Sequence, residues 1–168
     1  MAVGEAGPSG VSSVDESRFR DVLGHFASGV TVVTAVDTDP VGFTCQAFAA
    51  LSLDPPMVLL APAKSSTSWP RIARAGAFCV NVLASHQADL ARSFSRSGTD
   101  KFAGVEWRPG EATGAPVLPG ALSWAECALE QIVDSGDHEL VTGSVLALGV
   151  GDGEPLVFYR GGFGTFSG

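Results

Sequence analysis

The sequence predicts a mainly β fold, an antiparallel barrel with a few short helices packed at its ends. Three features carry this prediction. About six or seven short apolar segments follow one another at short spacing, 21 Gly and 10 Pro separate them, and only a few stretches have helical periodicity. Short strands with turns between them are typical of antiparallel sheets that close into barrels.

The N-terminal part of the chain predicts a tail and then one helix. Residues 1–14 are rich in Gly, Ser and Ala without periodicity, so we expect a tail with no fold of its own and one domain over residues 15–168. Four apolar residues then recur at helical spacing, namely Phe19, Val22, Leu23 and Phe26. Gly29 is placed to end this helix.

The stretch over residues 42–60 organises the first half of the chain. Before it, residues 30–36 are β-branched and predict a strand, which a turn over residues 37–40 connects to the next strand. Residues 42–60 predict a pair of strands whose small side chains let a ligand approach the backbone, and Pro55 and Pro56 suit the start of the second strand. Side-chain hydrogen-bonding groups in this stretch come from Thr44, Gln46 and Ser52.

Short helices alternate with strands in the middle of the chain. Hydroxyl groups over residues 65–68 are candidate caps for a short helix that carries Trp69 and ends at Gly76. Residues 78–83 predict a strand, and residues 86–94 predict a second short helix.

The last third of the chain predicts one irregular segment and three strands. Residues 95–120 are punctuated by Gly and Pro, and loops of this length are often functional lids or partner surfaces. Residues 121–133 and 138–148 predict two long strands joined by a hairpin turn over residues 134–137. Residues 156–160 predict a final strand.

Length, charge and cysteine content restrict the class of protein. A chain of 168 residues suits one domain with a real core, and a formal charge of −8 with ten Lys and Arg argues against a nucleic-acid surface. No apolar run approaches the roughly 20 residues of a membrane helix, and no secretory signal precedes the helix. The three cysteines form no CxxC pair and are typical of reduced core residues. We therefore expect a cytoplasmic protein without nucleic-acid or membrane partners.

The motifs of several enzyme classes are absent from the sequence. It has no GxGxxG after a strand, no phosphate-binding GxxxxGKS/T, no HExxH and no GxSxG. Its three histidines lack metal-ligand spacing, so no metal site is expected. Ser135, Asp137 and His138 are too close in sequence to adopt the geometry of a catalytic triad easily. We therefore expect a cofactor to supply the chemistry.

Four segments of the chain together resemble a known family. They are residues 26–34 (FASGVTVVT), 42–60 (GFTCQAFAALSLDPPMVLL), 136–138 (GDH) and 158–161 (FYRG). In order and spacing they are similar to the short-chain flavin reductases, the small components of two-component flavin-dependent monooxygenases. The resemblance runs from about Phe19 to Phe166. It implies a split barrel that binds flavin mononucleotide, normally as a homodimer with its flavin sites near the subunit interface.

The resemblance also implies which residues hold the flavin. A flavin needs donors for its phosphate, backbone polar groups for its ring edge, and an apolar bed that leaves one face open. By the resemblance, the isoalloxazine and ribityl chain lie along Pro40, Val41, Gly42, Phe43, Thr44, Gln46 and Ala47, with Ala61, Pro62 and Ala63 as the next wall. The implied phosphate contacts are Thr67 and Ser68 with help from Lys64, and the implied further contacts are Ser93 and Phe94.

A second group of residues is implied on the nicotinamide side. By the resemblance, His138 lies beside the nicotinamide, where an imidazole hydrogen-bonds the carboxamide or the flavin edge. The other implied positions are Phe158, Tyr159, Arg160 and Gly161. The implied reaction passes a hydride from NADH to free FAD or FMN, and the reduced flavin leaves to serve a partner monooxygenase. Such a step requires alignment and no conventional acid or base.

The choice of ligands and two other functions stay open at this point. FAD is favoured over FMN because the resemblance is closest to reductases that pair with aromatic hydroxylases. NADH is favoured over NADPH because few basic residues could hold a 2′-phosphate, Arg160 being the chief exception. The same barrel suits a non-catalytic flavin-binding or electron-carrier module, or a flavin oxidase of a small amine. The oxidase would need a clamp of Arg and Lys that the sequence does not show.

Overall fold

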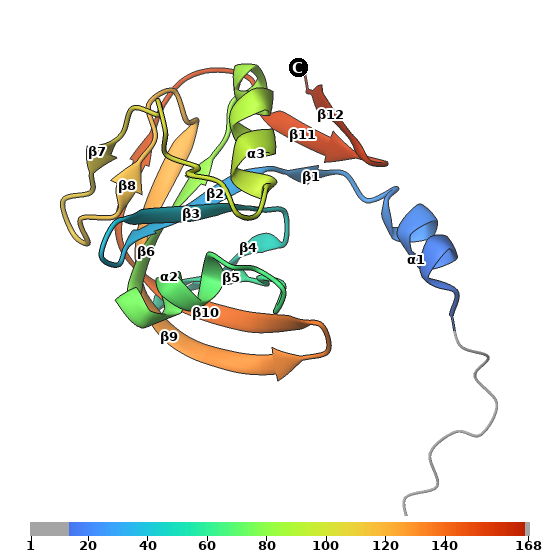
Figure 1. Cartoon of the computed structure of the whole chain (residues 1–168), viewed down its shortest axis with the longest axis horizontal. Coiled ribbons are helices and arrows are strands. Elements are labelled where there is room, and N and C mark those ends of the chain that lie inside the picture. The colour runs from blue at the N-terminus through green and yellow to red at the C-terminus, as the bar shows by residue number, and fades with distance from the viewer. Residues whose placement is uncertain (1–13, 167–168) are drawn as a thin grey trace, which may run out of the picture.

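In the computed structural model, which describes residues 14–166, strands predominate over helices and most of them lie in one curved sheet (Figure 1). The expectation of a tail over residues 1–14 falls almost entirely outside the described residues. Within the described range, no helix combines the length and the apolar character that a membrane span requires.

The main sheet has seven strands, and each neighbouring pair is antiparallel. Their order across the sheet is β3, β2, β6, β9, β10, β5 and β4. Their bounds are Thr31–Val36 for β2, Pro40–Cys45 for β3, Phe48–Leu53 for β4, Pro56–Leu60 for β5, Ala77–Val82 for β6, Ser123–Ser135 for β9 and His138–Val150 for β10. The long hairpin of β9 and β10 confirms the prediction of two long strands joined at residues 134–137.

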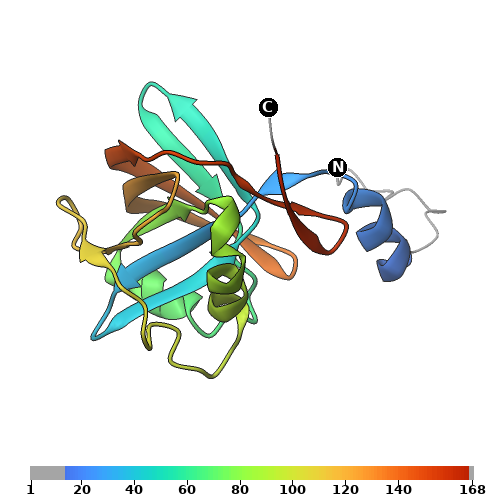
Figure 2. The same cartoon turned by 90° about the horizontal axis from the view of Figure 1, so that it is seen from above.

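The sheet curls because its two edge strands are consecutive in the chain. β3 and β4 stand at opposite edges of the sheet, but only Gln46 and Ala47 separate them in sequence. A link of two residues lets the flanking Cα atoms lie at most about 10 Å apart, so the two edges must approach each other there. No ladder joins β3 to β4 among the described strands. The result is the antiparallel split barrel that the sequence analysis expected (Figures 1 and 2).

The pairing within residues 42–60 differs from the prediction of one strand pair. β4 pairs with β5, whereas β3 pairs with β2. The stretch therefore contributes to two hairpins on opposite edges of the sheet. The link between them is fixed where the N–H of Ala61 donates to the carbonyl of Ala47 at 2.9 Å. As predicted, β5 begins at Pro56.

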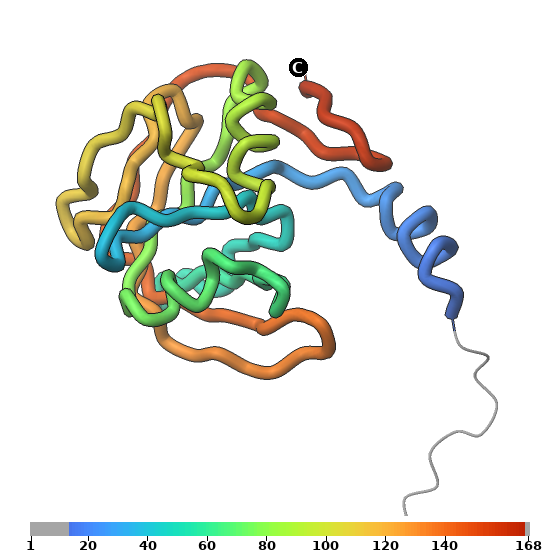
Figure 3. Tube along the Cα trace, viewed as in Figure 1, coloured from blue at the N-terminus to red at the C-terminus, as the bar shows by residue number. Residues whose placement is uncertain are grey.

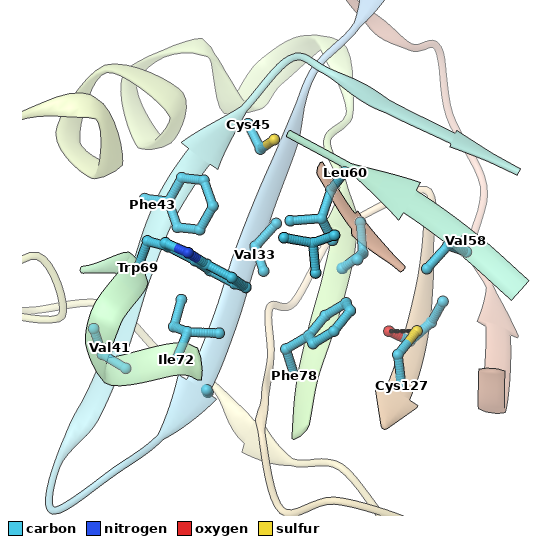
Figure 4. Packing of buried hydrophobic residues seen from close by; sticks show 14 residues of the cluster. Val33, Val41, Phe43, Cys45, Val58, Leu60, Trp69, Ile72, Phe78 and Cys127 are labelled. Atoms are coloured by element: carbon cyan, nitrogen blue, oxygen red, sulfur yellow. Dashed lines mark hydrogen bonds between the residues drawn. The ribbon is translucent and has the colours of Figure 1, made fainter. Parts of the chain in front are cut away.

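Large apolar side chains fill the barrel (Figure 4). Val33 on β2, Leu60 on β5 and Phe78 on β6 are fully buried and face one another. Helix α2 (Trp69–Ala75) packs against this cluster, and the ring of Trp69 meets that of Phe43 edge-on with 6.4 Å between centroids. Burying one such side chain contributes about 1.5–3 kcal/mol, so this cluster is a major source of stability.

A second cluster lies outside the barrel beneath α3 (Ala88–Ser95), which follows the short 3-10 helix η1 (Ser85–Gln87). Val32 alternates with Val33 along β2, and both are fully buried because α3 covers the outer face of that strand. Phe94 packs on this outer face. Its ring meets that of Phe102 edge-on, with 5.0 Å between the ring centroids. Trp107 packs there too, so aromatic side chains anchor the long segment over residues 95–120 to the barrel.

The segment predicted to be irregular contains the short pair β7 (Arg108–Pro109) and β8 (Pro116–Val117). Buried polar side chains fasten it to the barrel. Asn81 donates to the carbonyl of Pro116 at 3.2 Å and accepts from the N–H of Leu118 at 2.9 Å. The fully buried carboxylate of Glu126 accepts from the N–H of Thr113 at 2.6 Å. This long loop is thus held by specific hydrogen bonds as well as by aromatic contacts.

Helix α1 and a three-stranded sheet form an annex that projects from the barrel (Figure 3). The annex consists of α1 (Glu16–Leu23), β1 (Ser28–Gly29), β11 (Leu156–Tyr159) and β12 (Gly162–Thr165). The helix ends at Gly24, so the prediction that it continues to Gly29 is wrong. The reason is tertiary, because residues 28–29 leave the helix to pair with β11. No residue of α1 is buried, although the helix carries an apolar face.

Candidate functional site

One cavity of about 550 Å³ lies beside the link that joins β3 to β4. Its walls come from the end of β3, the link to β4, the loop after β5, the end of α3 and the start of β10. Ten residues implied by the resemblance line it: Phe43, Thr44, Gln46, Ala47, Ala61, Pro62, Ala63, Thr67, Phe94 and His138. The structure thus gathers residues nearly one hundred positions apart; we call this space the flavin cavity.

Small residues keep the walls of the flavin cavity open. Ala47, Ala61 and Ala63 present little more than backbone to it. The ring of Phe94 lies against the backbone of Gly42, where an added Cβ would come within 2.8 Å of a ring carbon. Thr44 donates its hydroxyl proton to the carbonyl of Ala91 at 2.6 Å, which ties α3 to the cavity wall. A planar ligand can therefore lie against backbone on one side without displacing a large side chain.

A cation stands at one end of the flavin cavity. Lys101 is half-buried, and its Nζ donates to the carbonyl of Gly42 at 3.1 Å and to the hydroxyl of Ser68 at 3.0 Å. Burial lowers the pKa of Lys101, since no carboxylate of the described residues lies within ion-pair distance of it. Thr67 and Lys101 line both this cavity and a neighbouring one of about 600 Å³, the phosphate-side cavity. Cation and hydroxyls together suit an anionic group such as a phosphate.

The sequence analysis missed Lys101. It lies in the long segment over residues 95–120, whose contacts no local pattern reveals. Composition offered one signal that could have found it. Lys101 is one of only ten Lys and Arg in a chain of net charge −8, so each of them is a candidate for binding an anion. Serines near the same region were missed as cavity residues as well, namely Ser65, Ser66, Ser95 and Ser97.

His138 reaches the flavin cavity from the first position of β10. Its Nδ1 lies 2.7 Å from a carboxylate oxygen of Asp137, and its backbone pairs with that of Ala63. Because Nδ1 faces the carboxylate, Nε2 is the ring nitrogen available to a ligand. The hydrogen bond from His138 holds the pKa of Asp137 below its usual range. Asp137 is therefore ionised at neutral pH and orients the ring.

Lys64, implied as a phosphate contact, instead holds the turn that carries His138. Its Nζ donates to Asp134 at 2.8 Å and to the carbonyl of Gly136 at 2.6 Å. Its backbone N–H donates to the carbonyl of Asp137 at 2.9 Å. These three contacts connect the loop after β5 to the β9–β10 turn, so Lys64 lies on the histidine side of the cavity.

A third cavity of about 600 Å³, the α1 cavity, lies between α1 and the turn from β11 to β12. Phe158, Arg160 and Gly161 line it, and it shares Gln46 with the flavin cavity. The structure therefore places three of the implied nicotinamide-side residues beside the flavin cavity and outside its own lining. Tyr159 is half-exposed. Its ring meets that of His25 edge-on, with 6.1 Å between the ring centroids.

The remaining implied residues divide between the phosphate-side cavity and the surface. Pro40, Val41, Gly42 and Ser68 line the phosphate-side cavity. Ser52, on β4, and the exposed Ser93, on α3, line none of the cavities described here. A match of residue types does not show which face of a strand or helix a residue occupies. For this reason the resemblance did not reveal that Ser52 and Ser93 lie outside the cavities.

Metal and thiol chemistry find no support within residues 14–166. No group of three His, Cys, Asp or Glu there could hold a metal ion. Cys45 lines the flavin cavity, but burial raises the pKa of its thiol to about 11. A protonated thiol is a poor nucleophile, so the site resembles a binding cavity for a planar anionic cofactor more than a covalent catalytic centre.

The sequence pattern of the flavin reductase like domain matches residues 23–167, which is most of the chain. The chain belongs to the flavin reductase family. It is 47% identical over 157 residues to the reductase subunit of a flavin-dependent monooxygenase from Rhodococcus jostii, covering 92% of this chain and 80% of that one. Two solved structures extend this similarity to the fold.

Component B of a nitrilotriacetate monooxygenase from Mycobacterium thermoresistibile superposes with a TM-score of 0.88 at 44% identity, over 92% of this chain and 88% of that one. An NADH:FAD oxidoreductase from Streptomyces globisporus, in complex with NAD and FAD fragments, also gives 0.88 at 35% identity, over 95% and 98% of the two chains. The family membership, the split barrel and the flavin reductase activity expected from the sequence are thereby confirmed.

Proposed function

We propose that this member of the flavin reductase family oxidises NADH, passes the hydride to a flavin in the flavin cavity, and releases the reduced flavin to a separate monooxygenase. The observation that supports this most directly is the convergence of an open backbone-lined wall, the cation of Lys101 and the imidazole of His138 on one cavity. A bound flavin supplies the electron-accepting chemistry, and NADH supplies the hydride.

The residues of the chain bind and align the reactants. Lys101 and Thr67 hold the flavin phosphate at one end, where the buried Ser68 hydroxyl keeps the Lys101 ammonium in place. The wall of Ala47 and Ala61 gives the ring backbone contacts on one side. His138 offers Nε2 to the nicotinamide carboxamide or to the flavin edge, while Asp137 and the Lys64 contacts keep the ring in position. Alignment of this kind is the main contribution a protein makes to hydride transfer.

FAD is the flavin that the cavities favour. The phosphate-side cavity continues from the flavin cavity past Thr67 and Lys101, so an adenylate attached to the flavin phosphate has space of its own. Arg71 lines this second space and donates to the carbonyl of Asp39 at 3.3 Å. FMN also fits the flavin cavity. Because it lacks the adenylate, it would leave the phosphate-side cavity empty and make fewer contacts with the protein.

We further propose a cytoplasmic homodimer. The support is the apolar face of the annex, which one copy of the chain leaves in water. Phe19, Val22 and Leu23 are each more than half exposed, and Phe26 just after the helix is 80% exposed. Exposed apolar faces of this extent are typical of protein interfaces. Light scattering coupled to gel filtration tests it, and a monomer at micromolar concentration would refute it.

The experiment that tests the proposed activity is NADH oxidation by the purified protein with FAD, FMN or no added flavin. We expect turnover that depends on added flavin, with a lower KM for FAD than for FMN. Gel filtration after turnover should separate the reduced flavin from the protein. A protein that stays yellow and inert towards NADH would instead support a non-catalytic flavin-binding module, and oxidation of small amines without NADH would support an oxidase.

A further inference from the structure

A cavity of about 620 Å³ outside the flavin site carries two indole rings and a cation. Trp107, Arg108 and Trp124 line it, and it shares no lining residue with the flavin, phosphate-side or α1 cavity. We infer that this space, which we call the indole cavity, binds a small aromatic carboxylate. Arg108 contacts the carboxylate of this ligand, and the two indoles pack on its ring.

The indole cavity lies at the end of the barrel away from His138. Its walls come from residues 105–108 and 117–121, the start of β9 and the end of β10. Val150 lines it at the last position of β10, whereas His138 stands at the first position of that strand, roughly 40 Å away along the backbone. Figure 1 shows β7 and β8 on the other side of the molecule from the β9–β10 turn. A ligand in the indole cavity is therefore separate from the reactants of hydride transfer.

Trp124 gives the indole cavity a fixed aromatic surface. It pairs with Gly149 across β9 and β10, and a Cβ on Gly149 would overlap the indole. The indole also packs against the buried side chains of Ala115 and Val117, while part of it stays exposed to the cavity. Because these contacts already order the ring, a ligand that packs on it costs little side-chain entropy.

Arg108 places a cation over this indole without an anionic partner. Its guanidinium carbon lies 5.1 Å from the centroid of the Trp124 ring. Within residues 14–166, no carboxylate lies within ion-pair distance of Arg108. A planar guanidinium stacks on aromatic faces and binds a carboxylate through two parallel hydrogen bonds. The cation is therefore available to an anion from outside the chain.

The rest of the lining restricts the class of ligand. Val105 and the buried Val117 and Leu118 add apolar surface to the two indoles. A small hydrated anion gains nothing from such a surface, whereas an aromatic ring does. Glu106, the one carboxylate of the lining, is exposed and disfavours ligands with more than one negative charge. A flat ring with a single carboxylate matches these walls best.

The three tryptophans allow a direct test by NMR, with benzoate as the probe. Trp107 and Trp124 line the indole cavity, whereas Trp69 is 3% exposed inside the barrel. We expect benzoate to shift the indole N–H signals of Trp107 and Trp124 in a saturable way and to leave that of Trp69 in place. Trp124→Phe assigns the signals. No saturable shift at millimolar benzoate, or a shift of Trp69 alone, would overturn the inference.

Arg108→Gln tests the contact to the carboxylate. We expect the calorimetric Kd for benzoate to rise about tenfold, the loss of a charged hydrogen bond. Arg108→Lys keeps the charge without the planar fork, so its Kd should rise only about threefold. Arg96→Gln is the matched control and should bind as the wild type does, because Arg96 lies just after α3 and lines none of the four cavities. Equal weakening by Arg96→Gln would show a general charge effect and overturn the assignment.

A series of small molecules tests the class of ligand. Benzyl alcohol keeps the ring without the charge, and acetate keeps the charge without the ring. We expect both to bind at least about tenfold more weakly than benzoate, because each loses one of the two contacts. Acetate that binds as tightly as benzoate would indicate an adventitious ion only and would overturn the aromatic site.

Competition with flavin separates the indole cavity from the flavin cavity. Saturating FAD should leave the Kd for benzoate within about twofold, and so should Lys101→Met, because Lys101 lines only the flavin and phosphate-side cavities. Displacement of benzoate by FAD would assign benzoate to the flavin cavity and refute this inference, but it would leave the reductase proposal standing. Conversely, a protein inert towards NADH that binds benzoate through Arg108 would refute the reductase and support the indole cavity.

Discussion

Two cations lie in neighbouring cavities, Lys101 in the flavin cavity and Arg160 in the α1 cavity, and the structure holds them in opposite ways. Lys101 is half-buried and bonded to protein oxygens of Gly42 and Ser68, without a carboxylate partner in the described part of the chain. Arg160 is exposed, lies in a strained turn and is paired with Asp21. The first is a preorganised anion site, and the second is a site whose counter-ion a ligand can replace.

This difference has a physical consequence for a reductase whose two ligands both have to leave. A buried cation gains more from an incoming phosphate because water screens the attraction less. An exposed cation that exchanges one anion for another gains little net energy, so its ligand leaves easily. The Lys101 end is thus suited to an anion that is held firmly, and the Arg160 end to an anion that binds and departs easily.

The largest expected effect concerns the buried thiol of Cys45, which lines the flavin cavity. Burial raises the pKa of the Cys45 thiol from 9.0 to about 11, which lowers its thiolate fraction about 100-fold at neutral pH. We expect folded protein at pH 8 to react with a disulfide reagent at least about 100-fold more slowly than protein in urea, with mass spectrometry identifying the site. If Cys45 in the folded protein reacts as fast as in urea, its thiol is not buried as the structure shows.

The three buried thiols, Cys45, Cys79 and Cys127, predict that the protein loses stability in alkali. Burial also raises the pKa of Cys79 and of Cys127 to about 12, whereas unfolded thiols ionise near 9. Because the folded pKa values are raised, this contribution to the free energy of unfolding is complete below pH 9 and is lost as the pH rises through 11 to 12. Urea denaturation between pH 8 and 11 measures it, and Cys79→Ala should reduce the pH dependence.

Lys101→Met should weaken flavin binding. Removing a charged hydrogen-bond donor to phosphate costs about 1.5–3 kcal/mol, so the Kd for flavin should rise roughly 10- to 100-fold. Flavin fluorescence titration measures it. Arg96→Gln is the control, since Arg96 lies just after α3 and lines none of the cavities described above. Equal loss in both variants would indicate a general charge effect.

Arg160→Gly should stabilise the fold. Relief of a left-handed residue is worth about 1–2 kcal/mol, which should raise the free energy of unfolding by up to that amount. The matched variant is Gly161→Ala, which places a side chain at φ of 81° and should lower it. Urea denaturation without ligand measures both. Destabilisation by Arg160→Gly would show that the Asp21 pair matters more than the backbone.

The smallest expected effect is that of Lys64→Met. Lys64 contacts the turn before His138 and no phosphate site, so we expect kcat with NADH to fall about threefold with the flavin Kd unchanged, as for an exposed ion pair. Lys64→Arg should recover most of the rate because it keeps the charge that pairs with Asp134. A rise in flavin Kd comparable to that of Lys101→Met would instead support the phosphate role implied by the resemblance.

The strands, and the cavity residues at the end of β3 and in the link to β4, were predictable because they depend on local pattern. Alternating and β-branched residues indicated β2, β6, β9 and β10, and the ordered match of four segments indicated the family. Two short strands of the annex were missed because β1 has two residues and β12 is glycine-rich, so neither carries a pattern. Their pairing with β11 is decided by the barrel that places them together.

The sequence by itself determined the strand-rich architecture, the family and most residues of the flavin cavity, because these follow from residue type and order. Only the tertiary structure decided what each polar side chain touches. It brought Lys101 to Gly42 and Ser68, turned Lys64 towards His138, and separated Arg160 from the flavin cavity. The physical reason is that such contacts join segments distant in the chain, and the curl of the sheet sets their distances.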